Sequence, residues 1–215
     1  MLQNPQKQYS PNKIVELYYN LGVNKLAHFK PNQGWSYSDM NYVLLGLLIE
    51  KIDNKTLAQS IRNRILAPLK MNYTYFELYE EPTETGTLLN QFIGELNFTE
   101  INTSFDWSGG GLVSTNKDLA KFIKGLFKLE LINQSSLNLM LATKFTKSNE
   151  NEYGLGIYKT IYNGKVFYGH YGFYGSYIGY CPKDGTIVSY CINQAHPNFN
   201  TYQYINEVIQ LTKYN

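Results

Sequence analysis

Apolar and polar residues follow a helical spacing through most of the chain and an alternating, strand-like spacing near its C-terminal end. Apolar residues three and four positions apart are typical of amphipathic helices. They predict helices over residues 11–21, 41–52, 56–66, 115–127, 136–143 and 201–212. Ser10 followed by Pro11 is typical of an N-cap and a first helical residue, and Gly22 predicts the end of that helix. Ser114 or Thr115 is the expected cap of a later helix, and Ser135 or Ser136 is expected to start the next one.

A different pattern begins after residue 150. Residues 153–162, 165–170, 176–181 and 186–193 form runs rich in β-branched and aromatic residues. Asn163-Gly164 is typical of a hairpin turn, and Asp184-Gly185 marks another turn. Helices, then a three- or four-stranded antiparallel meander, then a terminal helix predict an α+β fold. Without a repeat or linker, residues 1–215 are expected to form a single domain.

Composition excludes several classes of protein. The chain has 215 residues, of which 43% are hydrophobic and 17% charged, so it is not a disordered, charge-rich chain. A formal net charge of +2 provides no basic surface for nucleic acid, and we expect no nucleic-acid partner. The longest apolar run, residues 43–49, is interrupted by Gly46 and is too short to span a bilayer.

The ends of the chain and its cysteines bear on the compartment. Residues 1–12 lack the apolar core of a signal peptide, which favours a cytoplasmic product as given, or an exported one if the true start lies upstream. Cys181 and Cys191 flank a turn at 182–185, and antiparallel pairing around it separates them too widely for a disulfide. Both thiols are therefore expected to be free and partly buried, and the redox compartment stays open.

Three segments taken together resemble one known family. They read PNQGWSYSDMNYVLLGLLIE (31–50, continuing to APLKMNYT at 67–74), GGGLVSTNKDL (109–119) and YGHYGFYGSY (168–177). Their order is similar to that of the class C type of serine β-lactamases, which includes D-alanyl-D-alanine carboxypeptidases, esterases and D-amino-acid peptidases. The resemblance runs from about Ser10 to the C-terminus and implies a β-lactamase/transpeptidase-like fold, an antiparallel sheet flanked by helices.

The resemblance also implies a chemistry. The family transfers acyl groups through a serine that is assisted by a lysine one helical turn later, in an S-x-x-K motif. Its tyrosine motif corresponds to Tyr37-Ser38-Asp39, which implies that Tyr37 shares the general-base work. Its Lys/His-x-Gly strand corresponds to His170-Tyr171-Gly172, which implies an electrostatic role for His170 and an oxyanion-binding N–H at Phe173. The substrate would be a small molecule or a peptide, and no cofactor is implied.

Two positions depart from the family pattern. Asp39 replaces the usual Asn, and an ionised carboxylate accepts hydrogen bonds but cannot donate them. Asp39 therefore either pairs with a lysine or serves as an acid at the start of a helix. Tyr171 replaces a Thr that helps to bind a substrate carboxylate, and a bulky phenol there disfavours β-lactam recognition and favours an esterase or peptidase pocket.

The serine nucleophile is not evident. Ser10 and Ser114 both match S-x-x-K, with Lys13 and Lys117, but an N-cap role is sufficient to explain each serine. The family places its nucleophile several dozen residues before the tyrosine motif, and only 36 residues precede Tyr37. We therefore expect an N-terminally truncated fold that corresponds to the C-terminal two-thirds of the family domain.

Several functions stay open. One is a serine hydrolase acting on an ester, an amide or a D-amino-acid peptide, with its nucleophile in a missing segment, another chain or Ser10. Another is a non-catalytic remnant that binds a ligand or a partner, and a third is a structural partner that completes another chain's sheet. Truncation is expected to expose apolar surface on the sheet and on residues 42–52, and so to favour self-association, a completing chain or marginal stability. His28 and His196 lack acidic or Cys neighbours at ligand spacing, so no metal site is expected.

Overall fold

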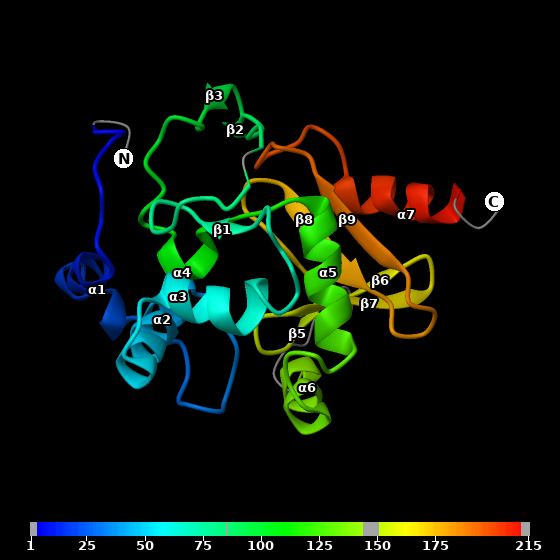
Figure 1. Ribbon diagram of the computed structural model, residues 1–215, viewed down its shortest axis with the longest axis horizontal. Helices are drawn as coiled ribbons and strands as arrows, with labels where there is room; N and C mark the ends of the chain where they lie inside the picture. Colours follow the sequence, from blue (N-terminus) through cyan, green and yellow to red (C-terminus); the bar gives the residue numbers. More distant parts are fainter. Residues whose placement is uncertain (1–3, 85, 144–150, 212–215) are drawn as a thin grey trace. The chain divides into compact units, whose positions relative to one another are not determined.

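The computed structural model describes residues 4–84, 86–143 and 151–211, and the chain divides into two compact units (Figure 1). Unit 1 consists of Met1–Thr87 and Glu100–Asp118, and unit 2 consists of Leu88–Thr99 and Leu119–Asn215. Each unit has its own apolar core.

Unit 1 is mainly helical. Its elements are α1 (Pro11–Asn20), a 3₁₀ turn (Val23–Lys25), α2 (Asp39–Asp53), α3 (Leu57–Ile61) with a following π-type turn (Arg62–Leu66), β1 (Tyr75–Phe76), α4 (Trp107–Gly110) and β4 (Leu112–Val113). Strands β1 and β4 pair in antiparallel fashion. The core gathers side chains from α2, α3, β1 and α4, with α1 packed against it: Val43, Leu57, Ala58, Phe76 and Trp107.

The predicted helix starts in unit 1 are mostly confirmed. The Ser10 side chain accepts a hydrogen bond from the Lys13 N–H at 3.3 Å, and Pro11 is the first helical residue. Thr56 and Gln59 form a capping box at α3, in which each side chain satisfies the other's backbone N–H. Helix α2 begins at Asp39, two residues before the predicted start. The short helix α4 lies outside the helices predicted from the sequence.

Helix α2 has one packed side and one apolar side that faces solvent. On the packed side, a Cβ at Gly46 would lie 2.7 Å from Ser108 Oγ and 2.9 Å from the Trp107 ring, so only glycine lets α4 approach this closely. The exposed side carries large apolar residues: Leu44, Leu45, Leu48, Ile49 and Ile52. The exposed apolar surface predicted for this helix is therefore present.

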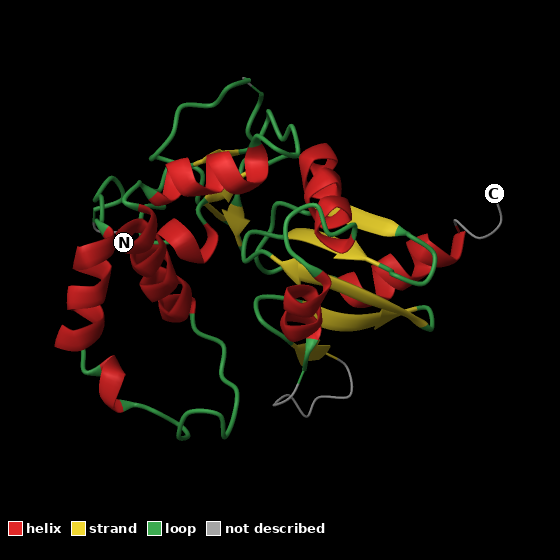
Figure 2. Ribbon diagram, turned by 60° about the horizontal axis from the view of Figure 1, so that its bottom comes forward, coloured by secondary structure: helices red, strands yellow, loops and turns green. Residues whose placement is uncertain are grey.

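Unit 2 is built on a five-stranded antiparallel sheet in the order β5-β6-β7-β8-β9 (Figure 2). The strands are β5 (Asn151–Tyr153), β6 (Tyr158–Tyr162), β7 (Lys165–Tyr171), β8 (Ser176–Tyr180) and β9 (Ile187–Cys191). A separate hairpin joins β2 (Phe92–Ile93) and β3 (Leu96–Asn97). The sheet has one strand more than predicted because the run 153–162 turns back on itself, with the Gly154 N–H bonded to the Ile157 carbonyl at 2.8 Å.

Helices cover both faces of this sheet. Neighbouring strand residues point to opposite faces, and in β8 Tyr177 packs with α7 (Thr201–Leu211) whereas Ile178 packs with α5 (Asn116–Phe127) and α6 (Gln134–Leu141). Thr115 caps α5 by accepting the Asp118 N–H at 3.2 Å. Helix α6 begins at Gln134, just before the predicted start at Ser135 or Ser136, and its cap is Asn133, whose side chain accepts the Ser136 N–H at 2.9 Å.

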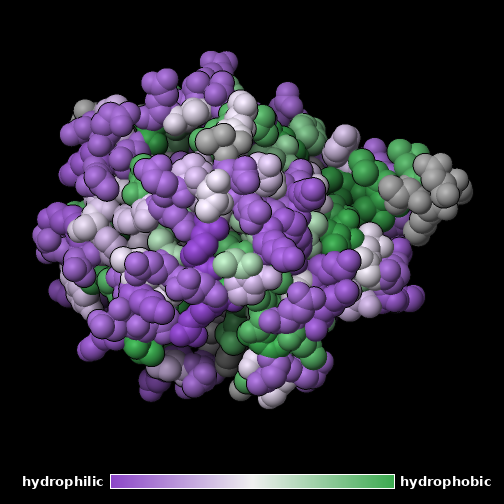
Figure 3. All heavy atoms as spheres, viewed as in Figure 1, coloured by the Kyte–Doolittle hydropathy of each residue, from purple (hydrophilic) through white to green (hydrophobic). Residues whose placement is uncertain are grey.

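Other expectations concern the surface and the cysteines. Figure 3 shows apolar atoms over α7, where Val208 and Leu211 are exposed. Both cysteines are free, as predicted, but only Cys181 is buried, whereas Cys191 is exposed. Among the helices of the described residues, none combines the length and the apolar character that crossing a membrane requires.

Candidate active site

His170 lies near the end of β7, inside the five-stranded sheet. It pairs with Ile178 across the β7–β8 ladder. The neighbouring Gly169 is required there: an added Cβ would lie 1.9 Å from the Ile178 carbonyl oxygen and 2.6 Å from the Gly179 Cα. The close approach of two backbones therefore fixes the strand that carries His170.

Two tyrosines and a carbonyl surround the His170 imidazole. Nδ1 lies 2.7 Å from the Tyr171 carbonyl oxygen, and Nε2 lies 3.0 Å from the Tyr153 hydroxyl. The Tyr158 ring lies 4.9 Å from the imidazole, centre to centre. Burial, followed by the charge of Tyr171, raises the pKa of Tyr158, so this phenol is neutral at physiological pH.

The turn after β7 presents the predicted oxyanion donor. The Gly172 N–H bonds to the Ser176 carbonyl at 2.8 Å, and the Gly175 N–H bonds to the Gly172 carbonyl at 3.0 Å, which closes a four-residue turn. Phe173 is its second residue and is 63% exposed. Among the residues the structure describes, the Phe173 N–H has no hydrogen-bond acceptor. A free N–H on a rigid turn can stabilise a developing oxyanion.

The Tyr171 side chain packs in the core on the α7 side of the sheet, although a pocket-lining position was expected. Its hydroxyl forms a short hydrogen bond with the Tyr162 hydroxyl, and its ring lies 4.6 Å from that of Tyr177. These residues belong to the cluster that α7 covers. Burial raises the pKa of Tyr171, with partial opposition from the hydrogen bond with Tyr162. The side chain is thus occupied by core packing, and Tyr171 reaches His170 through its carbonyl oxygen.

Tyr37 and Asp39 belong to unit 1. Tyr37 precedes α2 and is 45% exposed. Ser38 is the N-cap of α2, and Asp39 is the first helical residue. This location fits the interpretation of Asp39 as an acid at a helix N-terminus, where a negative charge is favourable. A Cβ at Gly109 would lie 3.3 Å from the Asp39 Cβ, so α4 packs close to this acid.

Both serine–lysine matches have other partners. The Lys13 ammonium bonds to Glu16 at 2.6 Å, and Ser10 is exposed at the end of a helix without buried residues. The pKa of Glu16 is lowered by this hydrogen bond. The Ser114 hydroxyl lies 2.8 Å from the Thr74 hydroxyl, and no hydrogen bond links it to Lys117 within the described ranges. The N-cap role predicted for Ser10 is therefore confirmed, whereas Ser114 lies just before the cap.

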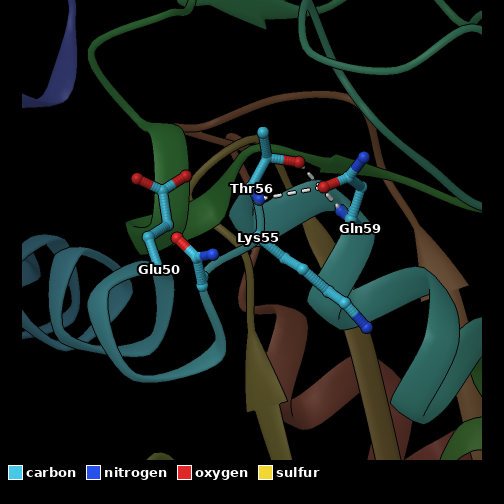
Figure 4. A pocket seen from close by; sticks show the side chains of 5 residues that line it. Glu50, Lys55, Thr56 and Gln59 are labelled. Carbon is cyan, nitrogen blue, oxygen red and sulfur yellow. Dashed lines mark hydrogen bonds between the residues drawn. The ribbon is translucent and has the colours of Figure 1, made fainter.

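Two surface hollows are lined by none of these residues. One of about 380 Å³ lies between the end of α2 and the start of α3 and is lined by Glu50, Asn54, Lys55, Thr56 and Gln59 (Figure 4). Three of its lining residues already make hydrogen bonds within the chain: Glu50 accepts the Leu57 N–H, and Thr56 and Gln59 cap α3. A second hollow of about 500 Å³ borders the start of α7. Across 4–84, 86–143 and 151–211, no three His, Cys, Asp or Glu residues gather as metal ligands would.

Sequence reasoning missed Tyr153 and Tyr158. Both sit in the run 153–162, which we expected to be one strand, and a single strand gives no reason to place residue 153 beside residue 170. The turn at Gly154 folds β5 back onto β6 and pairs Tyr153 with Tyr158. A glycine within a strand pattern was the available signal, since it often marks a bulge or a bend.

Comparison with known proteins identifies the family. The sequence model of the Beta-lactamase family matches residues 5–210. Penicillin-binding protein 4* of Bacillus subtilis (strain 168) is 29% identical over 161 residues, which are 66% of this chain and 35% of that protein. Protein flp of Staphylococcus aureus (strain N315) is 29% identical over 139 residues, 60% of this chain and 27% of that protein. The chain thus spans about a third of the length of these curated relatives.

Solved structures give the same fold. The D-amino acid amidase from Ochrobactrum anthropi SV3, in complex with D-phenylalanine, has a TM-score of 0.78 and 24% identity and covers 98% of this chain and 70% of its own. The octameric penicillin-binding protein homologue from Pyrococcus abyssi has a TM-score of 0.73 and 24% identity, over 95% of this chain and 48% of its own. The fold is therefore the predicted α+β fold of the β-lactamase/transpeptidase type. With the family model covering nearly the whole sequence, this chain belongs to the beta-lactamase family and shares the ancestry of its serine hydrolases.

Proposed function

We propose that this chain provides the histidine and oxyanion-binding part of a β-lactamase-related acyl-transfer site, for an ester, an amide or a D-amino-acid peptide. One observation carries the proposal: the Phe173 N–H is free of an acceptor in the described residues, on a turn that directly follows His170. In this proposal the Phe173 N–H binds the substrate carbonyl oxygen, Gly172 shapes the turn, and His170 stabilises charge beside it. Tyr37 is the general base, and Asp39 starts the helix that follows it.

The nucleophile in this proposal is neither Ser10 nor Ser114. A nucleophilic serine needs a base within hydrogen-bond reach, and Lys13 is bonded to Glu16 while Ser114 is bonded to Thr74. The same observations favour a second candidate function, a ligand-binding module without turnover. The two candidates agree on the binding residues and differ only in whether an acyl-enzyme forms on a serine supplied from elsewhere.

Binding of an amide substrate tests the proposal. The structure of the Ochrobactrum anthropi amidase holds D-phenylalanine, and D-phenylalanine amide is therefore a suitable probe. The Phe173 amide resonance is followed by NMR as the amide is added to the full chain. We expect this resonance to shift with saturation, because a hydrogen bond to the carbonyl oxygen changes the environment of the N–H proton.

Two substitutions at Phe173 separate the N–H from the ring. Phe173→Pro removes the N–H at a turn position that suits proline, whereas Phe173→Ala keeps the N–H and removes the ring. Binding should be lost in Phe173→Pro and His170→Ala and retained in Phe173→Ala. Equal affinity in Phe173→Pro and the unchanged chain would refute the oxyanion role, and so would the absence of any binding.

A further inference from the structure

Tyr153 is placed to hold His170 in one orientation. The two residues are 17 positions apart, and the Tyr153 hydroxyl lies 3.0 Å from His170 Nε2. Tyr153 is 7% exposed, and its ring meets the imidazole edge-on, at 5.7 Å between centres and 78° between planes. A buried hydroxyl aimed at a ring nitrogen constrains that ring more than an exposed one would.

The hydrogen-bond pattern assigns the protons. A carbonyl oxygen only accepts, so the 2.7 Å contact with the Tyr171 carbonyl requires a proton on His170 Nδ1. In the neutral imidazole the other nitrogen, Nε2, is then an acceptor, and it takes the hydroxyl proton of Tyr153. Both ring nitrogens are engaged, and the Nδ1–H tautomer is fixed.

Tyr153 is itself fixed by the backbone around it. It pairs with Tyr158 in the β5–β6 ladder, and the two rings meet edge-on at 4.5 Å. The next residue, Gly154, lies so near α6 that a Cβ would be 2.1 Å from the Met140 carbonyl oxygen. The Leu155 N–H bonds to the same carbonyl at 2.9 Å. The turn that carries Tyr153 is therefore anchored to α6 as well as to the sheet.

We propose that Tyr153 is a positioning residue for His170: its hydroxyl on Nε2 holds the imidazole with Nδ1–H directed at the Tyr171 carbonyl. This inference rests on the proposed function, because the orientation of His170 matters to catalysis only if His170 belongs to the acyl-transfer site. The one N–H of neutral His170 points at the Tyr171 carbonyl oxygen of its own strand. Nε2 can therefore donate a hydrogen bond only when the imidazole is protonated, and the Tyr153 hydroxyl then becomes the acceptor.

Nitrogen NMR tests this without any substrate. A His28→Gln/His196→Gln background removes two exposed histidines and leaves His170 as the single imidazole to observe. Long-range ¹H–¹⁵N correlations, recorded where the imidazole is neutral, show which nitrogen is protonated. We expect a protonated Nδ1 and an unprotonated Nε2 whose resonance is displaced by an accepted hydrogen bond.

Matched tyrosine variants isolate the hydroxyl. Tyr153→Phe keeps the ring and should move the Nε2 resonance to the position of a nitrogen that accepts no hydrogen bond. Tyr158→Phe removes a hydroxyl from the other ring beside His170 and should leave the Nε2 resonance unchanged, because no hydrogen bond joins that hydroxyl to the imidazole in the described chain.

Three results would overturn the proposal: a protonated Nε2 in the neutral imidazole, an Nε2 resonance that Tyr153→Phe does not move, or an equal displacement by Tyr158→Phe. The protonation pattern comes from a background with native tyrosines, so the test does not depend on the stability of Tyr153→Phe. Failure of the proposed function gives a different result: D-phenylalanine amide does not bind, while the protonation pattern of the His170 nitrogens is as expected.

Discussion

The segment around Tyr37 and the strand of His170, which carry the two proposed catalytic residues, are held very differently by the fold. Tyr37 is 45% exposed and precedes a helix whose outer side is a row of exposed leucine and isoleucine side chains. His170 lies within a five-stranded sheet, with a tyrosine hydroxyl and a carbonyl oxygen on its two ring nitrogens. In this chain the His170 imidazole is oriented by contacts on both ring nitrogens, whereas nearly half of the Tyr37 side chain is exposed to solvent.

This difference suggests where the chain tolerates change. A preorganised group loses little entropy when it binds, and the surrounding packing makes it sensitive to added volume. An exposed side chain such as that of Tyr37 has room around it and tolerates substitution with less effect on stability.

Gly169→Ala should give the largest loss of stability. The added Cβ would lie 1.9 Å from the Ile178 carbonyl oxygen, so the β7–β8 pair must move apart. Overpacking usually costs about 1–3 kcal/mol, and we expect the upper end because the obstacle is backbone. Thermal unfolding measures it, at about 2–4 °C per kcal/mol for a chain of this size. Gly110→Ala is the control, since a Cβ there meets nothing within 4 Å. Equal melting temperatures for the two variants would show that the His170 strand is less rigid than described.

Gly46→Ala should destabilise unit 1 less strongly. The new Cβ would meet the Ser108 side chain at 2.7 Å and the Trp107 ring at 2.9 Å. Side chains yield more easily than backbone, and alanine in a helix recovers about 1 kcal/mol of propensity relative to glycine. A net loss of about 1–2 kcal/mol is expected in chemical denaturation. A stability gain would mean that α2 and α4 are not packed as closely as the structure has them.

Ser10→Ala should loosen α1 without touching the His170 strand. Removal of an N-cap hydroxyl costs about 1 kcal/mol, which corresponds to roughly fivefold faster amide exchange in α1. Ser10→Asp keeps a capping oxygen and should exchange at the native rate. If both variants behaved alike, the cap would not be the reason for the serine at this position.

Asp184→Asn should have the smallest effect and a clear pH dependence. Hydrogen bonds with Lys165 and Thr186 hold the pKa of Asp184 below its usual range. A lowered acid pKa stabilises the fold above the unfolded value of about 3.9, and this contribution is lost as pH falls through the native pKa. The asparagine keeps an oxygen for Thr186 but loses the ion pair with Lys165, at a cost below about 1 kcal/mol at neutral pH. Urea unfolding at pH 7 and at pH 3 should show this cost shrinking in acid, and a constant cost would exclude the ion pair as its cause.

The sequence predicted the helices, the meander and the family because these depend on local periods and on motif order. The cap at Ser10 and the hairpin at Asn163-Gly164 are local features, and both are present. The setting of His170 was not predictable in the same way. The position of its partner Tyr153 depends on a chain reversal at Gly154, where the nearby Met140 carbonyl leaves no room for a Cβ, and this contact is between two different elements. The packing of Tyr171 against Tyr162 likewise depends on tertiary structure.

The most direct test of the account is intact-mass spectrometry after incubation of the full chain with a fluorophosphonate probe, with Ser10→Ala as the control. In the proposed function this chain supplies a histidine and an oxyanion-binding N–H, whereas among the described residues neither Ser10 nor Ser114 has a lysine ammonium within hydrogen-bond reach to activate it. It predicts no stoichiometric adduct on folded, monodisperse protein, and identical masses for the chain and the control. A stoichiometric adduct that disappears in Ser10→Ala would contradict it, because Ser10 would then be a nucleophile and the chain a self-sufficient serine hydrolase.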